Sequence, residues 1–338
     1  MLSTCISILL AICDGDPELS TKLAVIPSAN PAQATTAPAA DTAGPRISKF
    51  IRSGPVTLRS GQILTGRQIS NPNGPCIKGA GISHVRIHNN RIGPCGPSAN
   101  DAGIVLSNAH DIMVDHNSFD DVAGGLYVVN SSDNIVFEHN YARRIRGPFP
   151  RGQIVQFNGV TGSGNKIRCN VSDQSTPGYK AGTEDHINTW LSSGTETSPI
   201  LIQHNKLRGG GPSTSGGGIL AGDGGGSYIT IDTNILVNPG QYGIAIAGGH
   251  DNKLLNNQVY SASFTWSNAG LYVWNQYAPA SYGHEVSGNR VNWTNSSGLS
   301  NPWWNQGNTG PVTTINNLFG DLSIGPDIWN QKFPECDD

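Results

Sequence analysis

The sequence contains little charge, and this excludes several classes of protein. Only 13% of its 338 residues are Asp, Glu, Lys or Arg, and the formal net charge is −3. Because binding to DNA or RNA depends on a strongly basic surface, we expect no nucleic-acid partner. No run of 18 or more apolar residues occurs, so we also expect no transmembrane helix.

The six cysteines include no pair with the CxxC spacing of a zinc site. Cys76 and Cys95 are near enough in sequence to join neighbouring turns of a repeat fold, which would fit an oxidising compartment. Two free, buried thiols are an equally good interpretation of this pair.

Glycine and asparagine are abundant where charge is scarce. The 43 glycines disfavour long helices and favour short strands joined by tight turns. An apolar fraction of 36% is sufficient for a sizeable core. The composition therefore predicts an all-β protein.

The first 45 residues differ from the rest. Residues 1–23 are a candidate signal or leader segment, because Ile6 to Ile12 is a short apolar run, although no Lys or Arg precedes it. Residues 24–45 are rich in Ala, Pro and Thr and cannot bury enough apolar surface to fold. We expect a disordered N-terminal segment, one ordered domain with end caps over 46–338, and a protein that is secreted, periplasmic or on the cell surface.

A motif recurs from residue 80 onward: an apolar residue lies three positions before an asparagine, in most copies another lies five positions before it, and often another lies two positions after it. The asparagines are Asn90, Asn117, Asn140, Asn170, Asn205, Asn234, Asn257 and Asn289. A strand that bends sharply at an asparagine suits a coil of parallel strands, since Asn tolerates the left-handed conformation and its amide can bond to the next coil. The motif predicts an internal asparagine ladder.

A second recurring strand lies between the asparagine strands, as in Gly-Ile-Val-Leu at 103–106 and Gly-Leu-Tyr-Val-Trp at 270–274. Three strands per coil and about ten coils follow. The ladder and the Gly-apolar strands resemble the pectate-lyase-like superfamily of right-handed parallel β-helices over about residues 55–325. This resemblance implies a carbohydrate-related role, because that superfamily is rich in polysaccharide lyases, hydrolases, epimerases and tailspikes, but a fold alone does not fix a function.

Basic residues are concentrated in the longest coils. Nine of the 21 lie between residues 143 and 208, including Arg146, Arg151 and Arg208. Arginine binds carboxylates bidentately, so the pattern favours an extended acidic polysaccharide as the partner. Solubilising charge on loops is the alternative interpretation.

In one coil, the second recurring strand is mostly polar. This strand is Thr-Glu-Asp-His-Ile-Asn-Thr-Trp, residues 183–190. If Ile187 points inward, strict alternation places His186, Asn188 and Glu184 or Trp190 together on the outer face. A shift of register by one residue would exchange them with Asp185, and a polar stack inside the coil continuing from Gln156 is a structural alternative.

The neighbouring coils supply further candidates. The glycine-rich stretch 209–226 presents Asp223 one coil away from 184–190, and His250 occupies the corresponding corner of the next coil. Aromatic residues follow, and they either stack on sugar rings or close the C-terminal end. These residues are Tyr272, Trp274, Tyr277, Trp303 and Trp304.

Three functions fit these residues. A lyase or C5-epimerase acting on a uronate polymer would use Lys180, Tyr179 or His186 as the base, with Arg208 and Arg151, or Ca²⁺, neutralising the carboxylate.

A glycoside hydrolase would instead use the paired carboxyls of Asp185 and Asp223. A non-catalytic glycan-binding β-helix is the third hypothesis. Neither the Arg-x-Pro-x-x-Arg strand of pectate lyases nor the Asn-Thr-Asp and Gly-His-Gly set of polygalacturonases is present; Arg-Gly-Pro-Phe-Pro-Arg at 146–151 differs in spacing. We assign no metal ligands, since the acidic residues 111, 115, 120 and 121 only approach a calcium-binding cluster; Ca²⁺ stays an open cofactor of the lyase hypothesis.

Overall fold

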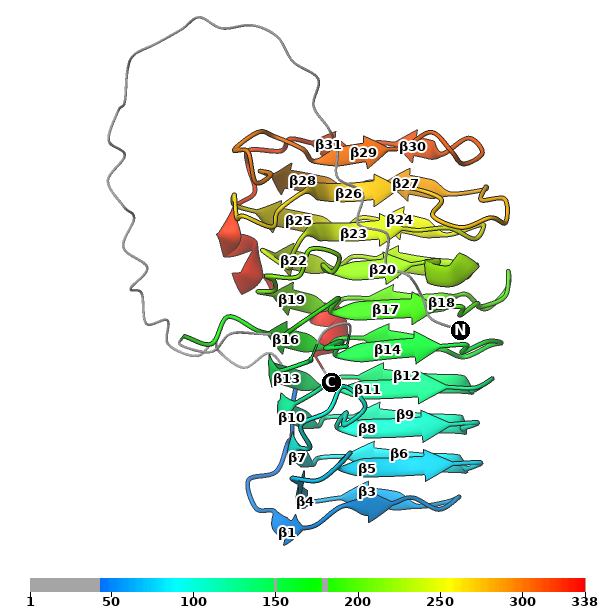
Figure 1. Cartoon of the computed structure of the whole chain (residues 1–338), viewed down its shortest axis with the longest axis vertical. Helices are drawn as coiled ribbons and strands as arrows, with labels where there is room; N and C mark the ends of the chain where they lie inside the picture. The colour runs from blue at the N-terminus through cyan, green and yellow to red at the C-terminus, as the bar shows by residue number, and fades with distance from the viewer. Residues whose placement is uncertain (1–42, 149–150, 178–181, 338) are drawn as a thin grey trace, which may run out of the picture. The chain divides into compact units, whose positions relative to one another are not determined.

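The computed structural model describes residues 43–148, 151–177 and 182–337. The predicted leader, 1–23, and all of the predicted linker except residues 43–45 lie outside these ranges. In the described part of the chain, short parallel strands are stacked in successive coils, and each full coil contributes one strand to each of three sheets (Figure 1). This is the predicted parallel β-helix of about ten coils.

Every third strand is a neighbour in the same sheet, and every pairing between sheet strands is parallel. Sheet A contains β1 (Ile51–Ser53), β4 (Arg67–Asn71), β7 (Arg91–Cys95), β10 (Ser118–Val122), β13 (Tyr141–Ile145), β16 (Val171–Asp173), β19 (Lys206–Arg208), β22 (Ile235–Val237), β25 (Gln258–Ser261), β28 (Arg290–Trp293) and β31 (Leu318–Phe319). Sheet B contains β2 (Val56–Thr57), β5 (Ile77–Ala80), β8 (Ile104–Ser107), β11 (Leu126–Val129), β14 (Val155–Asn158), β17 (Ile187–Trp190), β20 (Ile219–Ala221), β23 (Tyr242–Ile246), β26 (Ala269–Val273) and β29 (Trp303–Asn305). Sheet C contains β3 (Ile63–Thr65), β6 (Ser83–His88), β9 (His110–Asp115), β12 (Asp133–Glu138), β15 (Lys166–Arg168), β18 (Ile200–Gln203), β21 (Ile229–Asp232), β24 (Lys253–Leu255), β27 (Glu285–Ser287) and β30 (Thr313–Ile315).

The core fills the inside of the coil with one apolar layer per turn. In β11, Leu126 and Val128 are buried, whereas the alternate residues Tyr127 and Val129 lie on the outer face. This period-2 pattern is what a strand with one buried face requires. It leaves the outer face of each sheet free for function.

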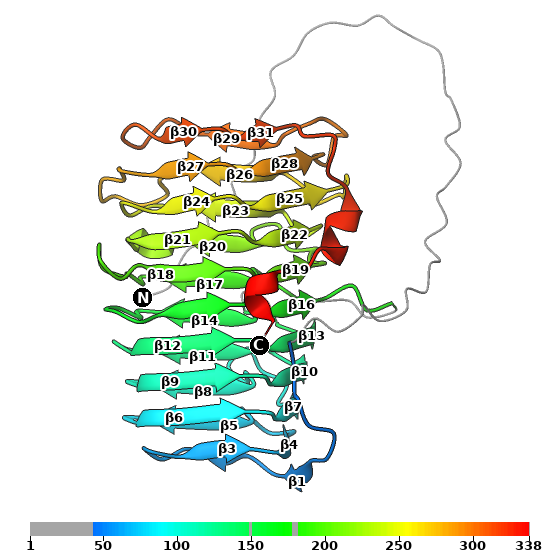
Figure 2. The same ribbon diagram turned by 180° about the vertical axis from the view of Figure 1, so that it is seen from behind.

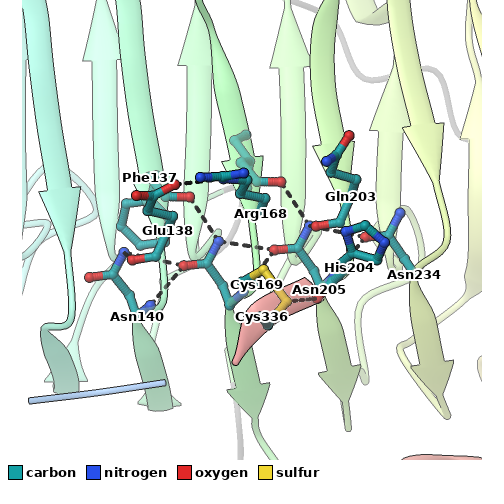
Figure 3. Close-up of a disulfide and its surroundings, with 12 residues drawn as sticks. Phe137, Glu138, Asn140, Arg168, Cys169, Gln203, His204, Asn205, Asn234 and Cys336 are labelled. Carbon is teal, nitrogen blue, oxygen red and sulfur yellow. Dashed lines mark hydrogen bonds and ion pairs between the residues drawn. A yellow bond between two sulfur atoms is a disulfide. The ribbon is translucent and has the colours of Figure 1, made fainter. Parts of the chain in front are cut away.

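The asparagine ladder is present and is one coil longer than predicted. Each ladder asparagine accepts hydrogen bonds at Oδ1 from the backbone and side-chain amides of the preceding one, and the series continues to Asn317. Figure 3 shows part of it, from Asn140 through Asn205 to Asn234. The ladder atoms are thus satisfied inside a buried corner, where an unpaired amide would be costly.

The position of the left-handed residue was predicted wrongly. Positive φ falls on the residue before the ladder asparagine, for example His116 at φ 53° and His204 at φ 56°. The preceding residue makes the bend, and this leaves the ladder asparagine in an ordinary conformation with its amide aimed into the corner. Histidine, cysteine and threonine all occupy this strained position here.

Two disulfides join parts of the coil. Cys76 and Cys95 are bonded, which resolves the two interpretations of that pair, and Cys169 is bonded to Cys336, a connection the sequence did not indicate. The C-terminal 3-10 helices η2 (Pro326–Asn330) and η3 (Pro334–Cys336) run back along sheet A instead of covering the last coil (Figure 2).

The corner that holds the Cys169–Cys336 disulfide also contains His204 (Figure 3). Within the described ranges, these three residues are the one group of three or more His, Cys, Asp or Glu side chains close enough to share a metal ion, and their sulfurs are bonded to each other. In the same part of the chain, no helix is both long enough and apolar enough to span a membrane.

Candidate functional site

The outer face of sheet B carries a column of residues paired in register from coil to coil. One member of the column is Asn188, in β17. The column reads Tyr127, Gln156, Asn188, Leu220, Ala245, Tyr272 and Trp304. Three carboxyl side chains gather beside its centre, and we refer to Glu184, Asp185 and Asp223 as the acid cluster.

Asp185 precedes β17 and is held by three donors. Its Oδ1 accepts hydrogen bonds from the backbone N–H of Gly217, at 2.9 Å, and from the hydroxyl of Tyr242. Its Oδ2 accepts one from Nδ2 of Asn188, at 3.0 Å. Asp185 is only 3% exposed, so its carboxyl is fixed in position and largely shielded from water.

A missing side chain makes the contact with Tyr242 possible. Tyr242 lies two coils from Asp185, and Gly217 lies between them. A Cβ on Gly217 would stand 2.8 Å from Cγ of Tyr242, so the tyrosine ring crosses the intervening coil where only glycine leaves room for it.

Asn188 links two members of the acid cluster. Its Nδ2 donates to Asp185 Oδ2 at 3.0 Å and to Asp223 Oδ2 at 2.8 Å, while its Oδ1 accepts from Gln156 at 2.9 Å. Both amide hydrogens and the carbonyl are thus used, which fixes the orientation of the amide. The two carboxyl oxygens are at most 5.8 Å apart, the sum of their distances to the shared nitrogen.

The remaining contacts come from two loops. Asp223, in the 3-10 helix η1 (Asp223–Gly225), also accepts from the hydroxyl of Tyr277. Glu184 accepts from the hydroxyls of Ser213 at 2.7 Å and Ser215 at 2.6 Å. The segment 209–217 therefore supplies donors to Glu184 and to Asp185, and it partly encloses both.

Burial dominates the electrostatics of the acid cluster. The loss of water around Asp185, reinforced by the charge of Glu184, raises the pKa of Asp185 to about 7 against the donors that favour its ionised form. Burial also raises the pKa of Asp223 and that of Glu184. Among the described residues, no Lys or Arg is a main cause of these shifts, and burial keeps protons on the cluster at pH values where ordinary carboxyls are ionised.

His186 is not on the outer face, so that prediction is wrong. Its side chain is fully buried; Nε2 donates to the carbonyl of Gly209 at 2.6 Å, and Nδ1 lies 2.9 Å from the hydroxyl of Ser172. The chain bends at residue 186, and the side chains of both His186 and Ile187 are buried, so strict alternation fails here. Burial lowers the pKa of His186 to about 4, which keeps the ring neutral.

Ile187 does point inward, and Asn188 and Trp190 lie on the outer face as predicted from that register. The polar side chains of this column therefore lie outside the coil, and the alternative of a polar stack inside it is wrong. Gln156 is nevertheless part of the polar column, because it donates a hydrogen bond to Asn188.

The predicted arginines are dispersed. Arg208, in sheet A, pairs with Asp173 and lies over the ring of Trp329, and Arg146 pairs with Asp121 at 2.8 Å. Arg151 adjoins sheet B: its guanidinium lies 4.9 Å from the ring centre of Tyr127.

Two other predicted residues, Tyr179 and Lys180, lie outside the described residues. His250 pairs with Asp251 at 2.8 Å and stacks on Tyr282 where sheet B ends, so its partners are not members of the acid cluster.

Aromatic side chains continue from the acid cluster towards the C-terminal coils. Trp190 meets Tyr277 edge to face at 6.0 Å, and Trp304 meets Tyr272 at 6.0 Å and Trp274 at 5.8 Å between ring centres. We refer to these five residues as the aromatic strip. Trp303, in contrast, faces inward and stacks on Phe319, so this member of the group packs against the core at the C-terminal end.

Sequence reasoning missed Tyr242, Ser213 and Ser215. Tyr242 stands in a strand that otherwise reads as an ordinary Gly-apolar strand, and its role depends on crossing Gly217. The serines lie in the glycine-rich stretch, where serine is common in turns and gives no distinctive signal.

Comparison with known proteins agrees with this fold. A family model described as "Right handed beta helix region" matches residues 46–189. No curated protein sequence matches the chain.

Among solved structures, the catalytic domain of a GH87 α-1,3-glucanase in complex with tetrasaccharides aligns with a TM-score of 0.50 at 12% identity, over 81% of this chain and 59% of that chain. The chain thus spans about three fifths of that protein's length. The A-module of the Azotobacter vinelandii mannuronan C-5 epimerase AlgE4 aligns with a TM-score of 0.39 at 11% identity, over 79% of this chain and 83% of that one. The chain is a right-handed parallel β-helix, and the resemblance to the pectate-lyase-like β-helices is confirmed at the level of the fold.

Proposed function

We propose that the protein is a carbohydrate-active β-helix that hydrolyses glycosidic bonds in an extended polysaccharide, with Asp185 and Asp223 as the acting carboxyls. The observation that carries this proposal is the bridge through Asn188, which holds the two carboxyls at most 5.8 Å apart at their nearest bonded oxygens. Glycoside hydrolases use two carboxyl groups roughly 5–9.5 Å apart, one on each side of the scissile bond.

The two carboxyls suit different tasks. Asp185 keeps its proton up to a pH of about 7, so it is the candidate general acid that protonates the departing sugar oxygen. Asp223 is more exposed than Asp185 and accepts hydrogen bonds from Asn188 and Tyr277, so it is the candidate ionised partner that faces the sugar ring.

A sugar can reach Asp185 only if the segment 209–217 moves. At 3% exposure its carboxyl cannot touch a sugar in the described conformation. The segment 209–217, which binds Asp185 through Gly217 and Glu184 through two serines, has to shift when substrate binds. Gly209 and Gly211 both have positive φ values within this segment, so glycine provides backbone freedom at two of its positions.

The lyase or epimerase hypothesis has less support. It needs a base and a cation close together. Arg208 pairs with Asp173, and His186 bonds to Ser172 and Gly209, so neither is placed beside the acid cluster; the other candidate bases, Tyr179 and Lys180, lie outside the described residues. An exported protein remains the expectation for localisation, and the two disulfides support it because such bonds persist in oxidising compartments.

The test is incubation of the purified protein with a panel of neutral and acidic polysaccharides, followed by assays for new reducing ends and for the ultraviolet absorbance of unsaturated uronates. Hydrolysis predicts reducing ends without that absorbance. Reducing ends accompanied by the absorbance would identify a lyase and refute the proposal. Release of neither, on every polymer, would favour a glycan-binding protein.

A further inference from the structure

The aromatic strip begins at the acid cluster and consists of two groups of touching rings, Trp190 with Tyr277 and Trp304 with Tyr272 and Trp274. Tyr277 bonds to Asp223 and meets Trp190, and both Tyr277 and Tyr272 pack on the buried cluster that includes Leu220 and Ala245. Leu220 and Ala245 belong to the column on the outer face of sheet B. The rings of Tyr272 and Tyr277 therefore cover β20 and β23 on that face.

The strip is long in the direction of the coil axis. Asn188, beside the acid cluster, and Trp304 are members of one column and are separated by four steps of strand pairing. At roughly 4.8 Å for each step, the strip extends about 19 Å from the carboxyls. Trp304 at its far end is 38% exposed, so its ring is accessible.

This part of the molecule has almost no positive charge. Between residues 209 and 331 the sequence contains two basic residues, Lys253 and Arg290. Lys253 pairs with Glu285 in sheet C at 3.4 Å, and Arg290 pairs with Asp321 beside sheet A at 2.7 Å. Neither lies on sheet B, and an anionic sugar on the aromatic strip would therefore lose water without gaining a cation.

We infer that the aromatic strip binds an uncharged stretch of glycan, several sugar rings long, which extends from the acid cluster towards the C-terminal coils. Sugar rings present apolar C–H faces that pack on exposed tryptophan and tyrosine rings, while their hydroxyls stay in water. Among the described residues, the basic side chains at sheet B, Arg151 and Lys78, lie on the opposite side of the acid cluster: Arg151 is next to Tyr127, and Lys78 is two steps of strand pairing beyond Tyr127. The inference rests on the proposed function only in taking the ligand to be a glycan. It proposes an uncharged ligand here, in place of the acidic polysaccharide that the basic residues between 143 and 208 led us to expect.

The test is affinity electrophoresis of the full chain in gels that contain dextran, pullulan, laminarin or galactomannan, with alginate and polygalacturonate for comparison. The Asp185→Asn variant is used so that the polymers stay intact. We expect retardation by at least one neutral polymer with little dependence on salt. Trp274→Ala and Trp304→Ala should each weaken this binding by about tenfold, the loss of roughly one aromatic stacking contact.

Tyr260→Ala is the matched control, because Tyr260 is an outward aromatic residue in β25 of sheet A and should leave binding unchanged. Retardation by the acidic polymers alone, weakening as salt increases, would overturn the inference, as would neutral-polymer binding that both tryptophan variants retain. If binding depends on the aromatic strip but the wild type releases no reducing ends, the proposal of hydrolysis is refuted and the inference that the strip binds glycan stands. If the wild type hydrolyses a neutral polymer and the strip variants bind that polymer as tightly as the wild-type strip does, the hydrolase proposal stands and the inference about the aromatic strip is refuted.

Discussion

Removing the charge from Asp185 should make the protein's stability less dependent on pH. The relevant variant is Asp185→Asn, which has nearly the same shape and cannot ionise. The folded-state pKa of Asp185 is about 7 and its ordinary value is 3.8, because the carboxyl is buried beside Glu184.

The magnitude follows from this difference. Between pH 4 and 7 the folded wild type holds a proton that the unfolded chain releases, so its free energy of unfolding falls as pH rises. A shift of about 3 pKa units corresponds to about 4 kcal/mol, which is fully present below pH 4 and fully lost above pH 7. The Asp185→Asn variant has no such dependence on pH, although its new amide would meet the donor amide of Asn188 at every pH.

The assay is urea unfolding of both proteins at intervals from pH 4 to pH 8.5. The stability of the variant minus that of the wild type should increase by about 4 kcal/mol across this range. Asp173→Asn is the control whose stability difference should stay nearly constant across this range. The hydrogen bonds and charge of Arg208, together with Ser175, outweigh burial and hold the pKa of Asp173 below its ordinary value of 3.8, so this carboxyl is ionised in both the folded and the unfolded chain above pH 4. A stability difference for Asp185→Asn that stays constant with pH would refute the description of this carboxyl.

Three further predictions concern the fold that supports the site. Asn170→Ala removes a ladder amide that bonds to Asn140, Asn205 and a backbone carbonyl, and urea unfolding should show a loss of about 3 kcal/mol or more, whereas a loss below about 1 kcal/mol would contradict the role of the ladder. Cys169→Ser opens the disulfide that spans 167 positions and should cost about 2–4 kcal/mol in the same assay, with unchanged stability as the contrary result. Gly217→Ala should displace Tyr242 and reduce turnover while the far-ultraviolet circular dichroism stays that of a β-helix; full turnover would show that the Tyr242 contact is dispensable.

The repeat made the fold predictable from the sequence. Eight asparagines, each with an apolar residue three positions before it and most with another five before it, specify a corner, an inner face and a coil length. Each further copy adds an independent observation of the same structure. The ninth ladder position, Asn317, was missed because the flanking residues of the last coil are exposed and therefore less apolar.

The site was predictable only where it followed the strand pattern. Asn188 and Trp190 could be placed by alternation, and Asp223 by its position one coil further on. His186 could not, because the corner before the strand turns two successive residues inward. Five other coils place glycine at the position of His186, for example Gly218 in the next coil, although the preceding coil has Ile154 there. This recurring glycine was the available signal.

The substrate charge illustrates a different limit. A count of basic residues along the sequence does not show which sheet each one faces, and Arg208 and Arg146 turn out to pair with acidic neighbours on sheet A. Tyr242 depends on contacts across two coils, which no local pattern records.

The most direct test of the central claim is the rate of reducing-end release by Asp223→Asn and Asp185→Asn on the polymer that the wild type cleaves best. Asp120→Asn is the matched control, since Asp120 pairs with Arg143 and Arg144 on sheet A. If the acid cluster carries the chemistry, each cluster variant should lose activity by about 10²-fold or more while the control stays near the wild-type rate. Cleavage at the wild-type rate by both cluster variants would contradict the claim and move the active site elsewhere on the molecule.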